Sequence, residues 1–91
     1  MRKVDKELGI IIKQKRLFFG YTQTEIAKTL GYSSPQFVHL IEQGKSKVPL
    51  KTWKKLCRKL YIPKEQVFRF LLKDYAYGVA KELGLDKELK Q

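Results

Sequence analysis

Cysteine and histidine are almost absent from this chain, which has one of each, Cys57 and His39. A single cysteine cannot form an intrachain disulfide, and this is typical of a protein from a reducing compartment. With no C-x-x-C pair to supply ligands, a zinc site is not expected either. No Ser-His-Asp or Cys-His arrangement, phosphate-binding loop or dinucleotide fingerprint is recognisable. We therefore expect neither an enzyme nor a bound metal or cofactor.

Long hydrophobic runs are also missing, and the run Ile10–Ile12 is far too short to span a bilayer. The N-terminal residues are charged and lack the apolar stretch of a signal peptide. No Gly/Ser-rich or low-complexity segment offers a linker, and 91 residues suit one small domain. The sequence predicts a cytoplasmic protein that does not use a membrane.

Acidic residues are scarce, because nine Asp and Glu stand against 20 Lys and Arg, for a formal net charge of +11. Such an excess indicates a polyanionic partner, nucleic acid first and an anionic membrane surface second. A positive surface that serves solubility alone is the plainer alternative.

Apolar residues recur with helical spacing in five segments, and no stretch is convincing as a strand. The predicted helices cover residues 5–19, 22–30, 34–43, 50–61 and 63–81, with each boundary approximate. Gly78 interrupts the last segment, which is either one helix or two pieces. The fold class is therefore all-α.

One face of each predicted helix should enter the core. These faces are Leu8, Ile11, Ile12, Phe18 and Phe19; Ile26, Ala27 and Leu30; Phe37, Val38 and Ile41; Leu50, Trp53, Leu56, Cys57 and Leu60; and Val67, Phe68, Leu71, Leu72, Tyr75 and Val79. Ile10 and Leu17 form a second stripe on the first helix. That stripe could receive the C-terminal segment or another subunit.

The segment from Thr22 to Gly44 predicts two short helices joined by a tight turn. Thr22-x-x-Glu25 is a capping box, in which a hydroxyl and a carboxylate satisfy two free backbone N–H groups. Gly31 ends the first helix in the left-handed conformation, and Gly44 closes the second. Ser33 or Ser34 should cap the second helix, with Pro35 in its first turn. Two such helices are the skeleton of a helix-turn-helix.

The stretch from Leu8 to about Leu72 resembles the lambda-repressor-like helix-turn-helix family, the class of phage Cro and repressor proteins. The resemblance is carried by Arg16, Gly20-Tyr21-Thr22-Gln23, Glu25-Ile26-Ala27, Leu30-Gly31, Ile41-Glu42-x-Gly44 and Pro49. It implies a compact five-helix bundle in residues 1–72, followed by a C-terminal helical extension in residues 73–91. It also implies a repressor-like transcriptional regulator that binds double-stranded operator DNA as a homodimer, with the second motif helix in the major groove.

Base contacts are expected from Ser34, Gln36 and His39, which share the polar, N-terminal part of the second motif helix. An amide such as Gln36 can make two hydrogen bonds to adenine. For His39, a solvated surface imidazole is the alternative. The chain has one residue more than the family pattern between Gly31 and Gly44. Counting from the first glycine places Phe37 in the core, and counting back from the second places Val38 there.

Phosphate contacts are expected mainly by resemblance, because the first turn of the first motif helix and the loop after the second follow the DNA backbone in that family. The expected residues are Gln23, Ser33, Gln43, Lys45, Ser46, Lys47 and Lys51. The resemblance also implies a partly buried ion pair between Arg16 and Glu42, in which the planar guanidinium meets a carboxylate.

The cations of the fourth predicted helix form an outer face without a single acid: Lys51, Lys54, Lys55, Arg58 and Lys59. They could strengthen nonspecific DNA association or meet a second, acidic partner. An antitoxin-like module, which binds a protein partner through the C-terminal helix, remains the alternative function. An RNA binder using this basic face is a third reading, although we expect no exposed aromatic platform for single-stranded RNA.

Overall fold

The first helix is the centre of the molecule, because three of the four other helices pack against it. The computed structural model describes residues 2–85, and all regular elements in that range are helical. They are α1 (Lys3–Phe18), α2 (Gln23–Leu30), α3 (Gln36–Glu42), α4 (Leu50–Leu60) and α5 (Lys64–Glu82). The prediction of an all-α, five-helix fold is confirmed.

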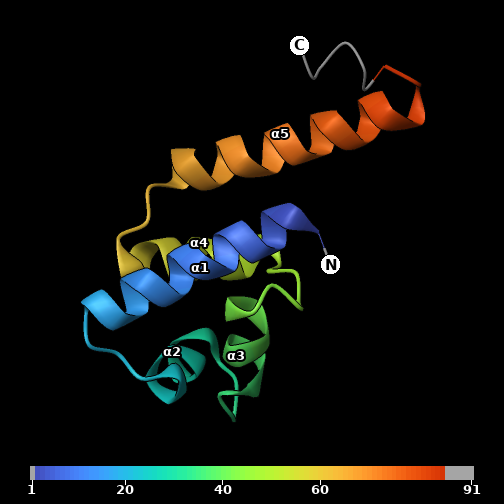
Figure 1. The fold of residues 1–91 in the computed structure, drawn as a ribbon. Coiled ribbons are helices and arrows are strands. Elements are labelled where there is room, and N and C mark those ends of the chain that lie inside the picture. Colours follow the sequence, from blue (N-terminus) through green and yellow to red (C-terminus); the bar gives the residue numbers. More distant parts are fainter. Residues whose placement is uncertain (1, 86–91) are drawn as a thin grey trace.

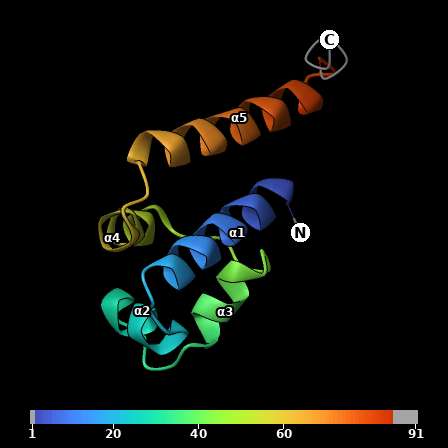
Figure 2. The same cartoon turned by 60° about the vertical axis from the view of Figure 1, so that its left-hand side comes forward.

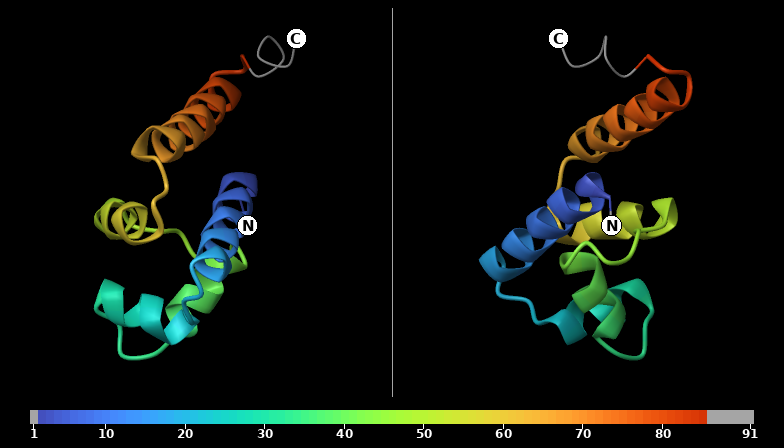
Figure 3. Two further views of the ribbon diagram at one scale, coloured as in Figure 1. Left: turned by 90° about the vertical axis from the view of Figure 1, so that its left-hand side faces the viewer. Right: turned by 45° about the vertical axis from the view of Figure 1, so that its right-hand side comes forward.

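The helices are arranged in three levels (Figure 1). α2 and α3 lie together at one end, α1 and α4 lie across the middle, and α5 runs along the opposite end. The same order is visible from the side, where α5 stands apart from α2 and α3 in every view (Figures 2 and 3). Among these helices, none combines the length and the apolar character that a membrane span requires.

The core is formed by the inner faces of α1 to α4. Its most deeply buried large side chains are Ile12, Val38, Ile26, Ile41, Leu56 and Leu60. Trp53 and Cys57 are buried beside them, which confirms that the cysteine is a core residue. Each of these residues lies on the face that its helical spacing predicted.

The first helix begins earlier than expected, at Lys3 rather than Asp5. Arg2 donates hydrogen bonds from Nε and Nη2 to the two carboxylate oxygens of Asp5, both at 2.9 Å. Arg2 also donates from Nη1 to Asp74 Oδ2 at 2.6 Å, which joins the start of α1 to the middle of α5. The hydrogen bond from Arg2 to Asp5 helps to raise the pKa of the arginine.

Several residues that were predicted to be buried are exposed. Phe18 is the last residue of α1 and Leu50 is the first of α4, so both extend past the ends of the packed region. On α5, only Val67 of the predicted stripe is buried, because the helix leaves the core and packs mainly on α1. The stripe Ile10 and Leu17 on α1 is also exposed, so α5 does not bury it.

The last described helix is one continuous rod that passes through Gly78 without a break. The last predicted segment is therefore one helix and not two pieces. The helix spans the expected boundary between residues 72 and 73, and it ends at Glu82, before Gly84 in the left-handed conformation. Residues 86–91 of the expected extension lie outside the described part of the chain.

Candidate nucleic-acid interface

α2 begins with the expected capping box. The Thr22 hydroxyl accepts a hydrogen bond from the Glu25 N–H at 3.0 Å, and the Thr22 N–H donates to Glu25 Oε1 at 2.9 Å. The bond from the Thr22 N–H to the carboxylate is the larger cause that holds the pKa of Glu25 below its ordinary value, and the nearby Thr22 side chain adds to it. The box fixes where the chain enters the helix-turn-helix.

The turn between α2 and α3 differs from the prediction in one respect. Gly31 ends α2 with φ +85°, as expected. α3, however, starts at Gln36 with Pro35 as its N-cap, and no side chain caps it. The expectation that Ser33 or Ser34 caps the helix is wrong, because both serines lie in a bend before it.

The core register of α3 is now defined. Val38 is fully buried and Phe37 is half-buried, with its ring 4.7 Å from that of Tyr32 in the turn. Counting back from Gly44, which predicted Val38 as the core residue, therefore identifies the deeply buried position. Gln36 and His39 are exposed on the opposite side, as the helical face analysis predicted.

Seven other polar positions near α3 are at least partly accessible. Ser33, Ser34 and Gln43 are exposed, Lys45 and Lys47 are exposed in the loop after α3, and Ser46 is half-buried between them. Lys51 is exposed in the first turn of α4. Among the described residues, no side chain of this group makes a hydrogen bond within the protein, so their contacts with DNA stay predictions.

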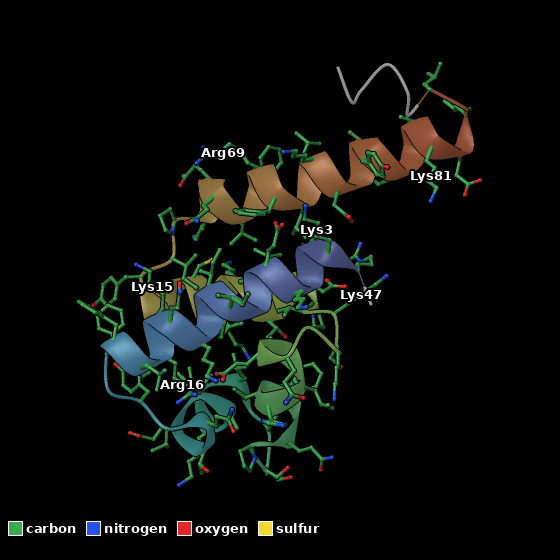
Figure 4. The ribbon with its side chains drawn as sticks, viewed as in Figure 1. Lys3, Lys15, Arg16, Lys47, Arg69 and Lys81 are labelled. Carbon is green, nitrogen blue, oxygen red and sulfur yellow. The ribbon has the colours of Figure 1, made fainter. Side chains whose placement is uncertain are left out.

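A buried ion pair connects α1 to the end of α3. Arg16 donates from Nε to Glu42 Oε2 at 2.6 Å and from Nη2 to Glu42 Oε1 at 3.0 Å. Both residues are buried, at 8% and 7% exposed. This is the pairing that the resemblance implied, in the two-bond geometry that suits arginine. Figure 4 shows Arg16 reaching from α1 toward α2 and α3.

Two further hydrogen bonds complete this network. Arg16 Nη1 donates to the backbone oxygen of Tyr21 at 3.0 Å, and Gln23 Nε2 donates to Glu42 Oε1 at 3.1 Å. Gln23 therefore braces α3 through Glu42, which leaves only part of its side chain accessible. The network ties α1, the start of α2 and the end of α3 into one rigid unit.

Two glycines allow α1 to lie very close to the end of α3. A Cβ atom at Gly9 would lie 2.7 Å from the Glu42 backbone oxygen, and one at Gly44 would lie 2.6 Å from the Lys6 Cα. Both distances are far below van der Waals contact. Gly44 also has φ +73°, which favours glycine for a second reason. The close approach fixes the position of α3 relative to α1.

A cluster of aromatic side chains at the end of α1 was not predicted from the sequence. The Phe18 and Phe19 rings are 5.0 Å apart, and Phe19 is 5.4 Å from Tyr61. Beside them, the Lys59 ammonium lies 4.4 Å from the centre of the Tyr21 ring, a cation–π contact. Phe18 and Tyr61 are exposed, which the expectation of no exposed aromatic platform for single-stranded RNA did not anticipate. The two consecutive phenylalanines before Gly20 are the sequence feature from which this cluster could have been predicted.

This geometry agrees with comparisons to known proteins. A family model described as Helix-turn-helix matches residues 12–65, which is more than half of the chain. The matched region runs from the middle of α1 into the first turn of α5. No curated protein and no solved structure matches the chain.

Proposed function

Because the chain belongs to the helix-turn-helix family of the Cro/C1 type, a family of DNA-binding regulators, we propose that it is a sequence-specific, repressor-like transcriptional regulator. In this proposal α3 lies in the major groove of operator DNA and α2 crosses the phosphate backbone. The net charge of +11 supplies the electrostatic attraction to DNA.

The observation that carries the proposal is the division of α3 into two faces. Val38 and Ile41 anchor the helix in the core, and Glu42 ties its end to α1. The side chains of Gln36 and His39 face solvent and make no hydrogen bond within residues 2–85, so their side-chain donors and acceptors are free. A rigidly held helix with a free polar face is what direct readout of base edges requires.

We assign phosphate contacts to the residues on either side of α3. Lys45, Ser46, Lys47 and Lys51 follow the helix in the sequence, Gln23 begins α2, Ser33 lies in the bend before α3, and Gln43 follows its last residue. Lysine and polar side chains of this kind position a protein on the duplex without reading its sequence. Two copies of the chain would place two α3 helices about 34 Å apart, one turn of DNA.

Selection from a randomised duplex pool at low and high salt tests the proposal. We expect a short two-fold-symmetric motif that persists at high salt. Gln36→Ala should cost about 1–3 kcal/mol in discrimination at one base position of each half-site. Gln14→Ala is the matched control, because Gln14 is an exposed glutamine on α1, away from α3.

Lys47→Ala should act differently from Gln36→Ala. It should weaken binding to all sequences by a similar factor and lower the salt slope by about one. If binding disappears at high salt and no motif is recovered, specific operator reading is refuted. A single-stranded RNA of random sequence should compete poorly with the recovered duplex.

A further inference from the structure

A groove between α4 and α5 is an apolar feature of the surface that DNA reading leaves unexplained. It has a volume of about 330 Å³. Its apolar lining includes Leu50, Trp53, Val67, Phe68, Leu72 and Tyr75. α5 lies at the opposite end of the molecule from α2 and α3, so the α5 wall of this α4–α5 groove is remote from the proposed DNA-reading helix (Figures 1 and 2).

The groove is apolar and open to solvent. Leu50 is 76% exposed, Phe68 64%, Leu72 52% and Tyr75 71%. Trp53 and Val67 form a buried floor beneath them. A contiguous exposed apolar surface of this kind marks an interaction site. A small molecule is normally enclosed over most of its surface, so an open groove with exposed walls suits a segment of another protein better.

The charge around the groove is positive. The two charged residues that line it are Lys54 and Lys64. Lys51 and Arg58 lie one turn before and after Lys54 on α4, and both are exposed. α4 contains no acidic residue, while Glu65 follows Lys64 on α5. The rim therefore attracts carboxylates on both sides of an apolar floor.

A second copy of the chain does not fit this charge pattern. Pairing the groove with itself about a two-fold axis would bring Lys54 and Lys64 of both copies into one interface. Like charges held close together across an interface oppose association. An acidic partner instead gains from both lysines, so charge complementarity selects between the two occupants.

We propose that the α4–α5 groove binds an amphipathic helix of a partner protein, with an apolar stripe flanked by Asp and Glu. From Lys64 to Tyr75, α5 extends about 17 Å along its axis, which matches about three turns of a partner helix. Leucine-like anchors at i, i+3, i+4 and i+7 would fill the floor, as in other helix-in-groove complexes. Their flanking carboxylates would face Lys54 and Lys64. This proposal does not depend on operator reading, and Lys51 is the residue that the rim shares with the proposed phosphate contacts.

The test uses a designed probe and the full chain. The probe is a fluorescein-labelled helical peptide with leucine at i, i+3, i+4, i+7 and i+11 and glutamate elsewhere. A second peptide replaces every glutamate with lysine, and a third keeps the composition but scrambles the leucine spacing. Fluorescence anisotropy measures affinity, and amide chemical shifts of the labelled protein locate the contact.

Substitutions at exposed positions test the groove without removing core side chains. Phe68→Ser combined with Leu72→Ser should weaken binding of the acidic peptide about tenfold or more. The matched control, Ile10→Ser with Leu17→Ser, changes two exposed apolar residues on α1 and should have no effect. Circular dichroism should show the same helix content in both variants.

A charge reversal separates specific docking from simple attraction to a basic protein. Lys54→Glu with Lys64→Glu should weaken the acidic peptide about tenfold and improve binding of the lysine peptide. Lys13→Glu with Lys28→Glu makes the same change in net charge at exposed sites outside the groove, and should have little effect.

Three results would overturn the proposal. The first is no binding of the acidic peptide, and the second is equal binding of the acidic and scrambled peptides. The third is a wild-type dimer in sedimentation that becomes monomeric in the Phe68→Ser, Leu72→Ser variant, since a second copy would then occupy the groove. Operator affinity is measured separately, so loss of peptide binding with DNA binding retained would refute this inference alone.

Discussion

Removing the Glu42 carboxylate should be the most damaging single change among the acidic residues of the described chain. Arg16 is 8% exposed in the wild type, and in the Glu42→Ala variant it would keep only its bond to the Tyr21 backbone oxygen. A buried charge that loses its partner costs about 3–5 kcal/mol. Because the guanidinium keeps this backbone bond, we expect a loss near the lower limit, about 3 kcal/mol.

This loss is large for a domain of 91 residues. Each kcal/mol lowers the melting temperature of such a domain by about 4–8 °C, so Tm should fall by at least about 12 °C. Urea unfolding followed by circular dichroism gives the free energy directly. Both measurements should be made on the wild type and the variant under identical salt conditions.

Glu7→Ala is the matched control, because Glu7 also faces a cation. Its oxygen lies 3.9 Å from Lys3 Nζ, and the lysine side chain is 88% exposed. An exposed pair of this type contributes about 0–1 kcal/mol. If Glu42→Ala and Glu7→Ala destabilise the protein equally, the buried network around Arg16 does not hold α3 as we describe.

Three further predictions concern the scaffold. Gly9→Ala places a Cβ 2.7 Å from the Glu42 backbone oxygen and should cost about 1–3 kcal/mol in urea unfolding, whereas Gly78→Ala, with open space around it, should not destabilise. Thr22→Ala should cost about 1 kcal/mol and raise the pKa of Glu25 only part of the way toward its ordinary value of 4.5, as measured by NMR titration, because alanine keeps the backbone N–H that is the larger cause. Because that pKa is lowered in the folded state, the contribution of Glu25 is complete above the unfolded pKa and is lost as pH falls through the folded one. Burial raises the pKa of Cys57, so its thiol should react slowly with Ellman's reagent at neutral pH and rapidly in urea; fast reaction without urea would contradict its buried position.

The parts of the fold that local chemistry determines were predicted from the sequence. Thr22 and Glu25 cap α2 because both partners of the box lie within one turn. Gly31 and Gly44 end helices because glycine, which has no Cβ, adopts a positive φ without a steric penalty. Val38 and His39 lie on opposite sides of α3 because they follow the helical period.

The wrong predictions concern burial and capping that depend on contacts between elements, which the pattern within one helix does not contain. Periodicity identifies the apolar stripe with Phe68 and Tyr75, but it does not say whether another element covers that stripe. Phe18 and Leu50 have the right spacing but lie at helix ends, beyond their neighbours. The serines before Pro35 are good capping residues, yet the longer turn places them too early.

The separation of α3 into a packed face and a solvent-facing face has a consequence for how such a protein can diversify. Ser34, Gln36 and His39 contribute little to packing, whereas the path of the helix is set from behind by Gly9 and by the Arg16 network. Under the proposed operator reading, substitutions at these outward positions would change the preferred operator one base at a time, with little loss of folding stability. Copies of the gene could acquire separate DNA targets while keeping one inherited framework.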